Sequence, residues 1–337
     1  MIYVLVYVSK IGCKDTQKYN IILHNGKEYL PLVKKTKNAH QCTKQHEFYL
    51  SLFTKNQQQM NLQQQIDKLF IRQQQEWQHF KNAIDAMKNI RQKRFEWGND
   101  FAVNVAFNIG RERSNRAKIE KSDAENRTCF LCEINRPTEQ QGVLFLEKYI
   151  LLCNPHPILQ QHVTIALHSH VPQRIRRKMD EMLTLAEALP DYIVFYNGAK
   201  SGASAPDHFH FQAGIKTPVL LQGDNELRSC LMIESESKNE AVELFEEVYH
   251  FLHQPDEDEP MMNIVAFTEN GKYNIHVFPR KAKRPKQYDM EGSKQLRITP
   301  GALDMAGLFT TIREEDFEKV TKQDIEDIYA QVSRQVI

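Results

Sequence analysis

The sequence predicts an α+β protein in which helices cover a mostly antiparallel sheet. Short apolar strand patterns recur, and a two-residue turn joins two of them at Asn270-Gly271. Helical patterns occupy residues 62–98, 173–189 and 238–252. With 337 residues and 41% hydrophobic side chains, the chain is long and apolar enough to bury sizeable cores.

Residues 1–59 are predicted to be an N-terminal extension of uncertain status, because no periodic pattern continues through them. The apolar run at residues 1–8 is interpreted as a strand, since it lacks a basic start and a cleavage pattern. Met60 is an alternative start of the working protein. Six cysteines without a disulfide framework, together with the absence of an apolar run of membrane-spanning length, favour a cytoplasmic protein.

Residues 60–98 predict one amphipathic helix that packs on the core and ends at Gly98. Residues 101–107 alternate as a strand and lead to a basic cluster at Arg111, Arg113, Arg116 and Lys118. Such a cluster is ordinarily a solvated surface, but a guanidinium can also hold phosphate, so Arg111 is a candidate ligand.

Residues 99–217 are predicted to form the first of two halves. Its strands are expected at residues 149–153, 162–167 and 191–196, and the last is expected to pair antiparallel with a strand at residues 207–214.

Residues 218–337 form the second predicted half. It contains strands at residues 262–267 and 273–278, and a final helix at residues 314–336. Its order of elements is similar enough to the first half to suggest a degenerate duplication.

Strict alternation over residues 207–214 places His208, His210 and Gln212 on one face of a strand. Two imidazoles and a carboxamide in a row suit chemistry at phosphorus, although an isolated His-x-His more often belongs to a half-buried strand without such a role. The preceding loop, residues 196–206, is rich in Gly, Ser and Ala, so its backbone N–H groups can approach phosphate oxygens.

Cys129 and Cys132 form a Cys-x-x-Cys pair, which commonly supplies half of a tetrahedral zinc site. Two packed or redox-active thiols are the alternative. His156, His162 and His168 are among the histidines that could complete such a site.

Residues 100–215 resemble the histidine triad superfamily, specifically its nucleotidyltransferase and phosphorylase branch. The resemblance rests on His162-Val163-Thr164-Ile165 with His170, on Asn197 eleven positions before His208, and on the signature at residues 207–213. Gln212 stands where the hydrolases of this superfamily have a third histidine. Galactose-1-phosphate uridylyltransferases and the GDP-L-galactose and GDP-D-glucose phosphorylases have a glutamine at this position, and the signature resembles theirs. A looser resemblance to these enzymes extends over residues 62–337.

The resemblance implies a histidine triad-like fold in two halves, the second degenerate. It implies that His210 is the nucleophile that takes a nucleoside monophosphate, with His208 and Gln212 beside it. Its implied nucleotide and phosphate ligands are Asn197, Gly202, Ser204, Arg111 and His162. In zinc-bearing relatives the implied metal ligands would be Cys129, Cys132, His170 and His208, a structural site; no organic cofactor is expected.

The leading hypothesis is a nucleotidyltransferase or phosphorylase that acts on a nucleotide-sugar, with GDP-hexose favoured and phosphate or a sugar phosphate as acceptor. The alternatives are a dinucleoside polyphosphate phosphorylase or hydrolase, and a nonenzymatic nucleotide-binding protein. A net charge of +1 gives no general attraction to nucleic acid or anionic membranes. A monomer or a homodimer is expected.

Overall fold

The computed structural model describes residues 18–22, 29–33, 60–98, 101–108, 128–223 and 226–336. The chain divides into two compact units, Met1–Asn61 and Leu62–Ile337. In the first unit, β1 (Lys18–Ile22) pairs antiparallel with β2 (Tyr29–Val33). The strand predicted at residues 1–8 and the basic cluster that includes Arg111 lie outside the described residues. Within the described ranges, no helix combines the length and apolarity that a membrane span needs.

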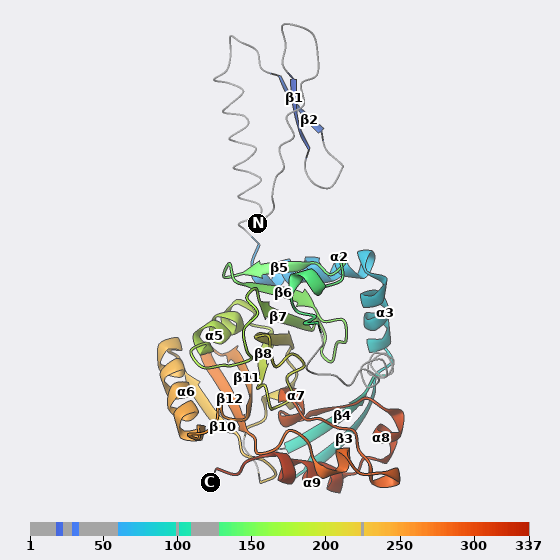
Figure 1. Cartoon of the computed structure of the whole chain (residues 1–337), viewed down its shortest axis with the longest axis vertical. Helices are drawn as coiled ribbons and strands as arrows, with labels where there is room; N and C mark the ends of the chain where they lie inside the picture. The colour runs from blue at the N-terminus through green and yellow to red at the C-terminus, as the bar shows by residue number, and fades with distance from the viewer. Residues whose placement is uncertain are drawn as a thin grey trace. The chain divides into compact units, whose positions relative to one another are not determined.

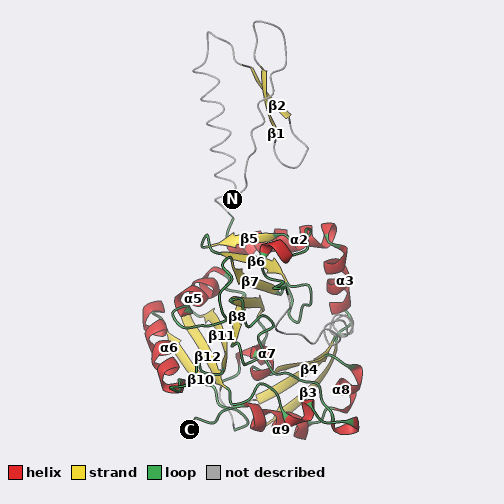
Figure 2. Cartoon of the chain, in the orientation of Figure 1, coloured by secondary structure: helices red, strands yellow, loops and turns green. Residues whose placement is uncertain are grey.

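The second unit is built on an eight-stranded sheet in which every neighbouring pair is antiparallel (Figures 1 and 2). Its order is β10-β12-β11-β8-β9-β7-β6-β5. The strands are β5 (Gly142–Phe145), β6 (Tyr149–Cys153), β7 (Val163–Leu167), β8 (Tyr192–Asn197), β9 (His210–Ile215), β10 (Leu231–Ser235), β11 (Met262–Glu269) and β12 (Lys272–Pro279). The prediction of a mostly antiparallel α+β fold is confirmed.

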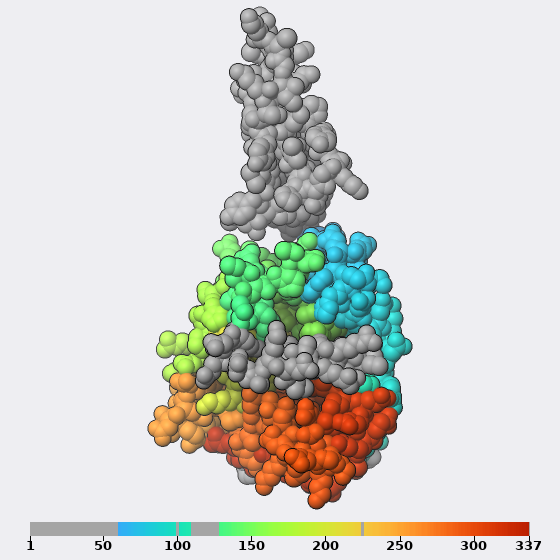
Figure 3. All heavy atoms as spheres, turned by 45° about the vertical axis from the view of Figure 1, so that its right-hand side comes forward, coloured from blue at the N-terminus to red at the C-terminus, as the bar shows by residue number. Residues whose placement is uncertain are grey.

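This sheet crosses the boundary predicted between residues 217 and 218, because β11 of the second half pairs with β8 of the first. Leu62–Ile337 is therefore one compact unit, and the two predicted halves are not separate domains. Figure 3 shows one face of this unit, with its N-terminal elements in blue and green and its C-terminal third in orange and red.

A three-stranded sheet packs beside the large one. It has the order β13-β4-β3, with β3 (Arg91–Trp97) antiparallel and β13 (Leu308–Thr311) parallel to β4 (Phe101–Phe107). The short helices α7 (Ala302–Met305) and α8 (Glu314–Lys319) and the longer α9 (Lys322–Val332) surround it.

Strand β8 is buried along its whole length because both faces of the large sheet are covered. Val194 and Tyr196 enter one core with α2 (Leu62–Glu76), α5 (Met179–Ala188) and α6 (Lys238–Leu252), whereas Phe195 enters a second core with the small sheet and α9. Phe211 of β9 belongs to the first core, so alternation turns the residues on either side of it toward the second face. The candidate site lies on that second face.

The predicted single helix over residues 60–98 is wrong. The structure has α2 (Leu62–Glu76), a break at Trp77, α3 (Gln78–Met87) and then strand β3. Trp77 is extended (φ −124°, ψ 95°) and buried, and its ring stacks on Phe80 at 5.9 Å. Packing of the two aromatic rings and pairing of β3 with β4 override the helical spacing.

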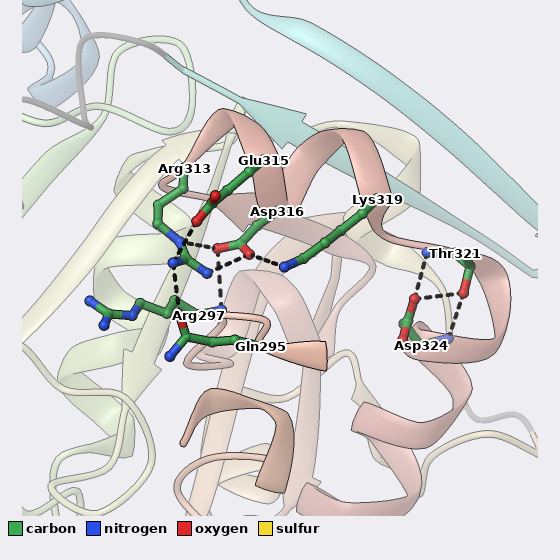
Figure 4. A network of polar contacts seen from close by, with 8 residues as sticks. All are labelled: Gln295, Arg297, Arg313, Glu315, Asp316, Lys319, Thr321 and Asp324. Carbon is green, nitrogen blue, oxygen red and sulfur yellow. Dashed lines mark hydrogen bonds and ion pairs between the residues drawn. The ribbon is translucent and has the colours of Figure 1, made fainter. Parts of the chain in front are cut away.

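Two other predicted helices are shorter than expected. The helix predicted at residues 173–189 begins only at Met179. The predicted final helix is divided into α8 and α9 at Thr321, whose hydroxyl and backbone form a capping box with Asp324 (Figure 4). By contrast, α6 occupies the predicted residues, and Asn270 and Gly271 have the positive φ values of 51° and 77° that a tight hairpin requires.

Candidate functional site

The signature strand begins later than predicted, because β9 starts at His210 and His208 lies in the segment before it. His210 and Gln212 share the second face of the sheet, but the ring of His208 is engaged elsewhere. Its Nε2 lies 2.7 Å from the Leu167 carbonyl, and its Nδ1 lies 3.2 Å from Cys129 Sγ. The predicted row of three side chains is therefore a pair, with His208 in an adjoining cluster.

His210 is held in one tautomer. Its Nδ1 lies 2.9 Å from the His208 carbonyl oxygen, an acceptor only, so the proton is on Nδ1. Nε2 then carries the lone pair that a nucleophilic imidazole needs.

Gln173 fixes the backbone of His210. The Gln173 carboxamide accepts from the His210 N–H at 2.8 Å and donates to the His210 carbonyl at 2.9 Å. It also donates to the Asn197 carbonyl at 3.0 Å, and the whole side chain is buried. This one amide thus connects the start of β9 to the end of β8. The sequence does not indicate this role, because its pattern predicts a helix that begins at Gln173.

Gln212 is oriented by His162. The Ile158 N–H donates to Nδ1 of His162 at 3.1 Å, so the His162 proton is on Nε2. That Nε2 lies 2.9 Å from Gln212 Oε1 and donates to it. The carboxamide oxygen of Gln212 is thereby engaged, and its NH2 group remains the donor offered to a ligand. His162, predicted as a phosphate ligand, acts on the site through Gln212 as well as lining the cavity.

Asn197 is oriented in the same sense by a second chain of buried groups. Its Oδ1 accepts from the Ala302 N–H at 2.7 Å and from Asn263 Nδ2 at 2.9 Å. Asn263 in turn accepts from Arg280, which is 2% exposed and also donates to the Pro300 carbonyl. Burial lowers the pKa of Arg280 to about 10. Arg280 is therefore a buried support for Asn197.

A cavity of about 450 Å³ adjoins these groups. The cavity is lined by four of the candidate residues, Gln212, Asn197, Gly202 and Ser204, and it has an apolar wall formed by Trp77, Phe130, Leu131 and Leu152. His210 itself is 2% exposed and is not part of the lining, so a ligand reaches its Nε2 only if neighbouring side chains move. A larger cavity of about 1010 Å³ is lined by residues of α2, α3 and β3, and none of the predicted site residues lines it.

The Gly202 loop lies close to the second half of the chain. Gly202 has φ 95°, and a Cβ there would lie 3.1 Å from the Gly301 Cα and the Pro300 carbonyl. A Cβ at Gly301 would lie 2.9 Å from Asn197 Oδ1. Larger residues at either glycine would push this loop away from Asn197, which gives both glycines a steric role at the site.

Cys129, Cys132, His170 and His208 converge, and their ligand atoms all lie within 4.8 Å of one another. Cys132 Sγ is 3.1 Å from His170 Nδ1 and 3.6 Å from His208 Nδ1. Two thiols and two imidazoles at these separations fit a tetrahedral zinc ion, and the bond from His208 Nε2 to the Leu167 carbonyl is the outer contact typical of a zinc-bound histidine. Burial lowers the pKa of His208, which keeps the ring neutral as a ligand must be. The four residues implied by the resemblance are thus brought together.

Known proteins resemble this chain in a family model and in solved structures. A family model described as a domain of unknown function (DUF4922) matches residues 69–215. No curated protein matches the chain. The crystal structure of yeast Ap4A phosphorylase Apa2 is similar with a TM-score of 0.50 and 17% identity, over 76% of this chain and 96% of that one. The same yeast enzyme in complex with AMP matches with a TM-score of 0.50 and 17% identity, over 77% and 96%.

This likeness shows that the chain shares the fold of that yeast enzyme, with helices packed on a largely antiparallel sheet. The resemblance of the signature to the GDP-hexose phosphorylase group stays a prediction, because neither the family model nor these structures test it.

Proposed function

We propose that this protein is a nucleotidyltransferase of the phosphorylase type that works through a covalent nucleotidyl-His210. The observation that carries the proposal is the tautomer of His210. With Nδ1–H donated to the His208 carbonyl, Nε2 presents its lone pair on the same sheet face as the oriented amide of Gln212.

In the first half-reaction, the Nε2 lone pair attacks the phosphorus of a bound nucleotide. A P–N bond forms as the bridging P–O bond breaks, and the leaving oxygen keeps the electron pair. The NH2 groups of Gln212 and Asn197 donate to the non-bridging oxygens, where negative charge develops. In the second half-reaction, an oxygen of inorganic phosphate attacks the same phosphorus, the P–N bond breaks and a nucleoside diphosphate is released.

A dinucleoside polyphosphate is the donor class that we favour. The similar yeast structures are of an Ap4A phosphorylase, and the cavity places an apolar wall for a base beside amide donors for phosphate. A GDP-hexose is the second candidate, supported by Gln212 in the signature. Both donors release a phosphate-bearing leaving group, so neither requires a general acid at position 212.

The experiment is intact-protein mass spectrometry after brief incubation with diadenosine tetraphosphate or GDP-glucose, without acceptor. Wild type is compared with His210→Ala and with the control His250→Ala, which changes an exposed histidine on α6. An AMP adduct supports the favoured donor if it is absent from His210→Ala and is removed when phosphate is added. A GMP adduct with the same behaviour supports GDP-hexose. Absence of both adducts and of turnover refutes the phosphorylase and favours nucleotide binding without catalysis.

We also propose that Cys129, Cys132, His170 and His208 hold a structural zinc ion, which would link the Cys-x-x-Cys loop to the segment before β9. Metal analysis of the purified protein is expected to give about one zinc per chain. Cys132→Ser should lose most of the metal and lower the melting temperature, whereas Cys230→Ala, a buried thiol elsewhere, should keep it. A wild-type protein free of zinc after purification in zinc-containing medium would contradict this assignment.

A further inference from the structure

The floor of the cavity beside Gln212 is a row of side chains from four neighbouring strands. Gln212 of β9 pairs with Phe195 of β8 on one side and with Thr164 of β7 on the other. Thr164 in turn pairs with Leu152 of β6. All four residues line the cavity. Within this row, Thr164 carries the one hydroxyl group, between the amide of Gln212 and an apolar leucine.

Thr164 faces the cavity because the side chains of strand β7 alternate. Its neighbours Val163 and Ile165 are fully buried and belong to the first core, on the other face of the sheet. Threonine and valine have the same β-branched shape and both favour strands, so neither packing nor strand formation requires a hydroxyl at this position. What the hydroxyl adds is a polar group in the cavity.

Asn154 determines how the hydroxyl of Thr164 is turned. The backbone N–H of His156 donates to Asn154 Oδ1 at 2.8 Å, which identifies the oxygen end of that carboxamide. The other end, Nδ2, donates to Thr164 Oγ1 at 3.1 Å. Because Oγ1 already accepts from this N–H, its own proton points elsewhere, and within the described part of the chain no acceptor takes it. The hydroxyl is therefore left as a donor toward the cavity.

Two other side chains of the site are oriented in the same way. The Oε1 atom of Gln212 accepts from His162, so its NH2 group faces a ligand. The Oδ1 atom of Asn197 accepts from the Ala302 N–H, with the same result. Thr164 follows this pattern, since its oxygen is engaged by the protein and its proton is offered. Donors of this kind suit the anionic oxygens of phosphate, which only accept hydrogen bonds.

We propose that the Thr164 hydroxyl is a third donor of this site, which binds an oxygen of the phosphate group held by Gln212, and that Asn154 is its positioning residue. This inference rests on the proposed function and adds a residue that recognises the nucleotide. Directly opposed residues of antiparallel strands have Cβ atoms about 5 Å apart, so both side chains can reach oxygens of one phosphate group. The contact is already present in the bound nucleotide, so binding without turnover detects it.

Thr164→Val tests the contact, because it removes the hydroxyl and keeps the shape of the side chain. Binding of AMP and GMP is measured by titration calorimetry, and binding of adenosine and guanosine by displacement of the monophosphate. The variant should bind the preferred monophosphate about tenfold more weakly than wild type and the nucleoside equally well. Thr164→Ser, which keeps the hydroxyl, should stay within about threefold of wild type. Unchanged affinity for the monophosphate, or an equal loss for the nucleoside, would overturn the proposal.

A second comparison tests the role of Asn154. Asn154→Ala should weaken binding of the monophosphate by about threefold in wild type and cause no further loss in the Thr164→Val background. Equal losses in the two backgrounds would overturn the positioning role. Thr184→Val is the matched control and should leave the affinity unchanged, because it removes a hydroxyl from α5, which packs on the other face of the sheet.

Failure of the proposed function is seen separately from failure of this inference. A wild type that binds AMP or GMP but forms no adduct on His210 disproves the covalent reaction, while the affinities of the Thr164 variants still decide the phosphate contact. A wild type that binds neither monophosphate overturns both.

Discussion

Replacing Gln173 with methionine tests whether a buried amide outside the lining of the candidate-site cavity sets the position of His210, the proposed nucleophile. Methionine has nearly the same length but no polar group. The change deprives three buried backbone groups of their partner, namely the His210 N–H, the His210 carbonyl and the Asn197 carbonyl.

The magnitude follows from these three contacts. An unsatisfied buried backbone group costs about 1–3 kcal/mol, and the cost of burying the glutamine amide is removed at the same time. We therefore expect Gln173→Met to lower the free energy of unfolding by about 3 kcal/mol. A shift of the His210 ring by about 1 Å would slow attack on phosphorus by about 100-fold.

Stability is measured by urea unfolding, and catalysis by the rate of adduct formation at saturating donor. Gln323→Met, which changes an exposed glutamine on α9, is the control and should alter stability by less than about 0.5 kcal/mol. A positioning role predicts that the maximal rate falls while the half-saturating donor concentration changes little. A variant that is destabilised but forms the adduct at the wild-type rate would refute the positioning argument, and one that is unchanged in both would refute the energetic argument as well.

Three further predictions follow from single contacts. His162→Phe removes the donor to Gln212 Oε1, so the amide is free to turn and adduct formation should slow by about tenfold with the fold retained, as circular dichroism would verify. Asp316→Ala removes the buried carboxylate to which Arg313 donates two hydrogen bonds (Figure 4), so the free energy of unfolding in urea should fall by about 3 kcal/mol. Asp324→Ala, which removes the cap of α9, should lower it by about 1 kcal/mol, and equal losses would contradict this account. Burial raises the pKa of Glu259 to about 7, so the folded state binds the carboxyl proton more tightly than the unfolded state does. The contribution of Glu259 to the free energy of unfolding therefore falls by roughly 3 kcal/mol as the pH rises from about 4.5 to about 7. Glu259→Gln should flatten that part of the curve of unfolding free energy against pH, and an unchanged slope would be inconsistent with the shift.

The elements predicted well are those whose local pattern and tertiary surroundings agree. The hairpin at Asn270-Gly271 has turn residues that suit its positive φ values, and α6 has a serine cap at Ser237 and a regular apolar face. The prediction of one helix over residues 60–98 was wrong because Trp77 is extended and stacks on Phe80, and because β4 supplies a strand partner for residues 91–97.

The placement of the candidate residues was predicted in part, and the residues that support them were not. Alternation correctly placed His210 and Gln212 on one face of a strand, and the Cys-x-x-Cys pair lies in a cluster with His170 and His208, as the resemblance implied. The roles of these residues stay predictions. Gln173, Asn263 and Arg280 carry no motif, since each acts through contacts with residues distant in the sequence. Burial of a polar side chain is a property of the assembled fold, and periodicity in one segment cannot show it.

The two oriented amides explain what glutamine contributes at position 212. His162 holds Gln212 Oε1, and Asn263 with the Ala302 N–H holds Asn197 Oδ1, so both carboxamides present donors, which suit phosphate oxygens and not hydroxyl protons. An amide has no titrating proton to give, so the leaving group in the proposed reaction departs with its own negative charge. The site then favours donors in which a pyrophosphate bond is cleaved, because a phosphate leaves readily as an anion. Nucleoside phosphoramidates, whose amine must be protonated to leave, should form the His210 adduct far more slowly than diadenosine tetraphosphate at the same pH, and equal rates would mean that another group supplies the proton.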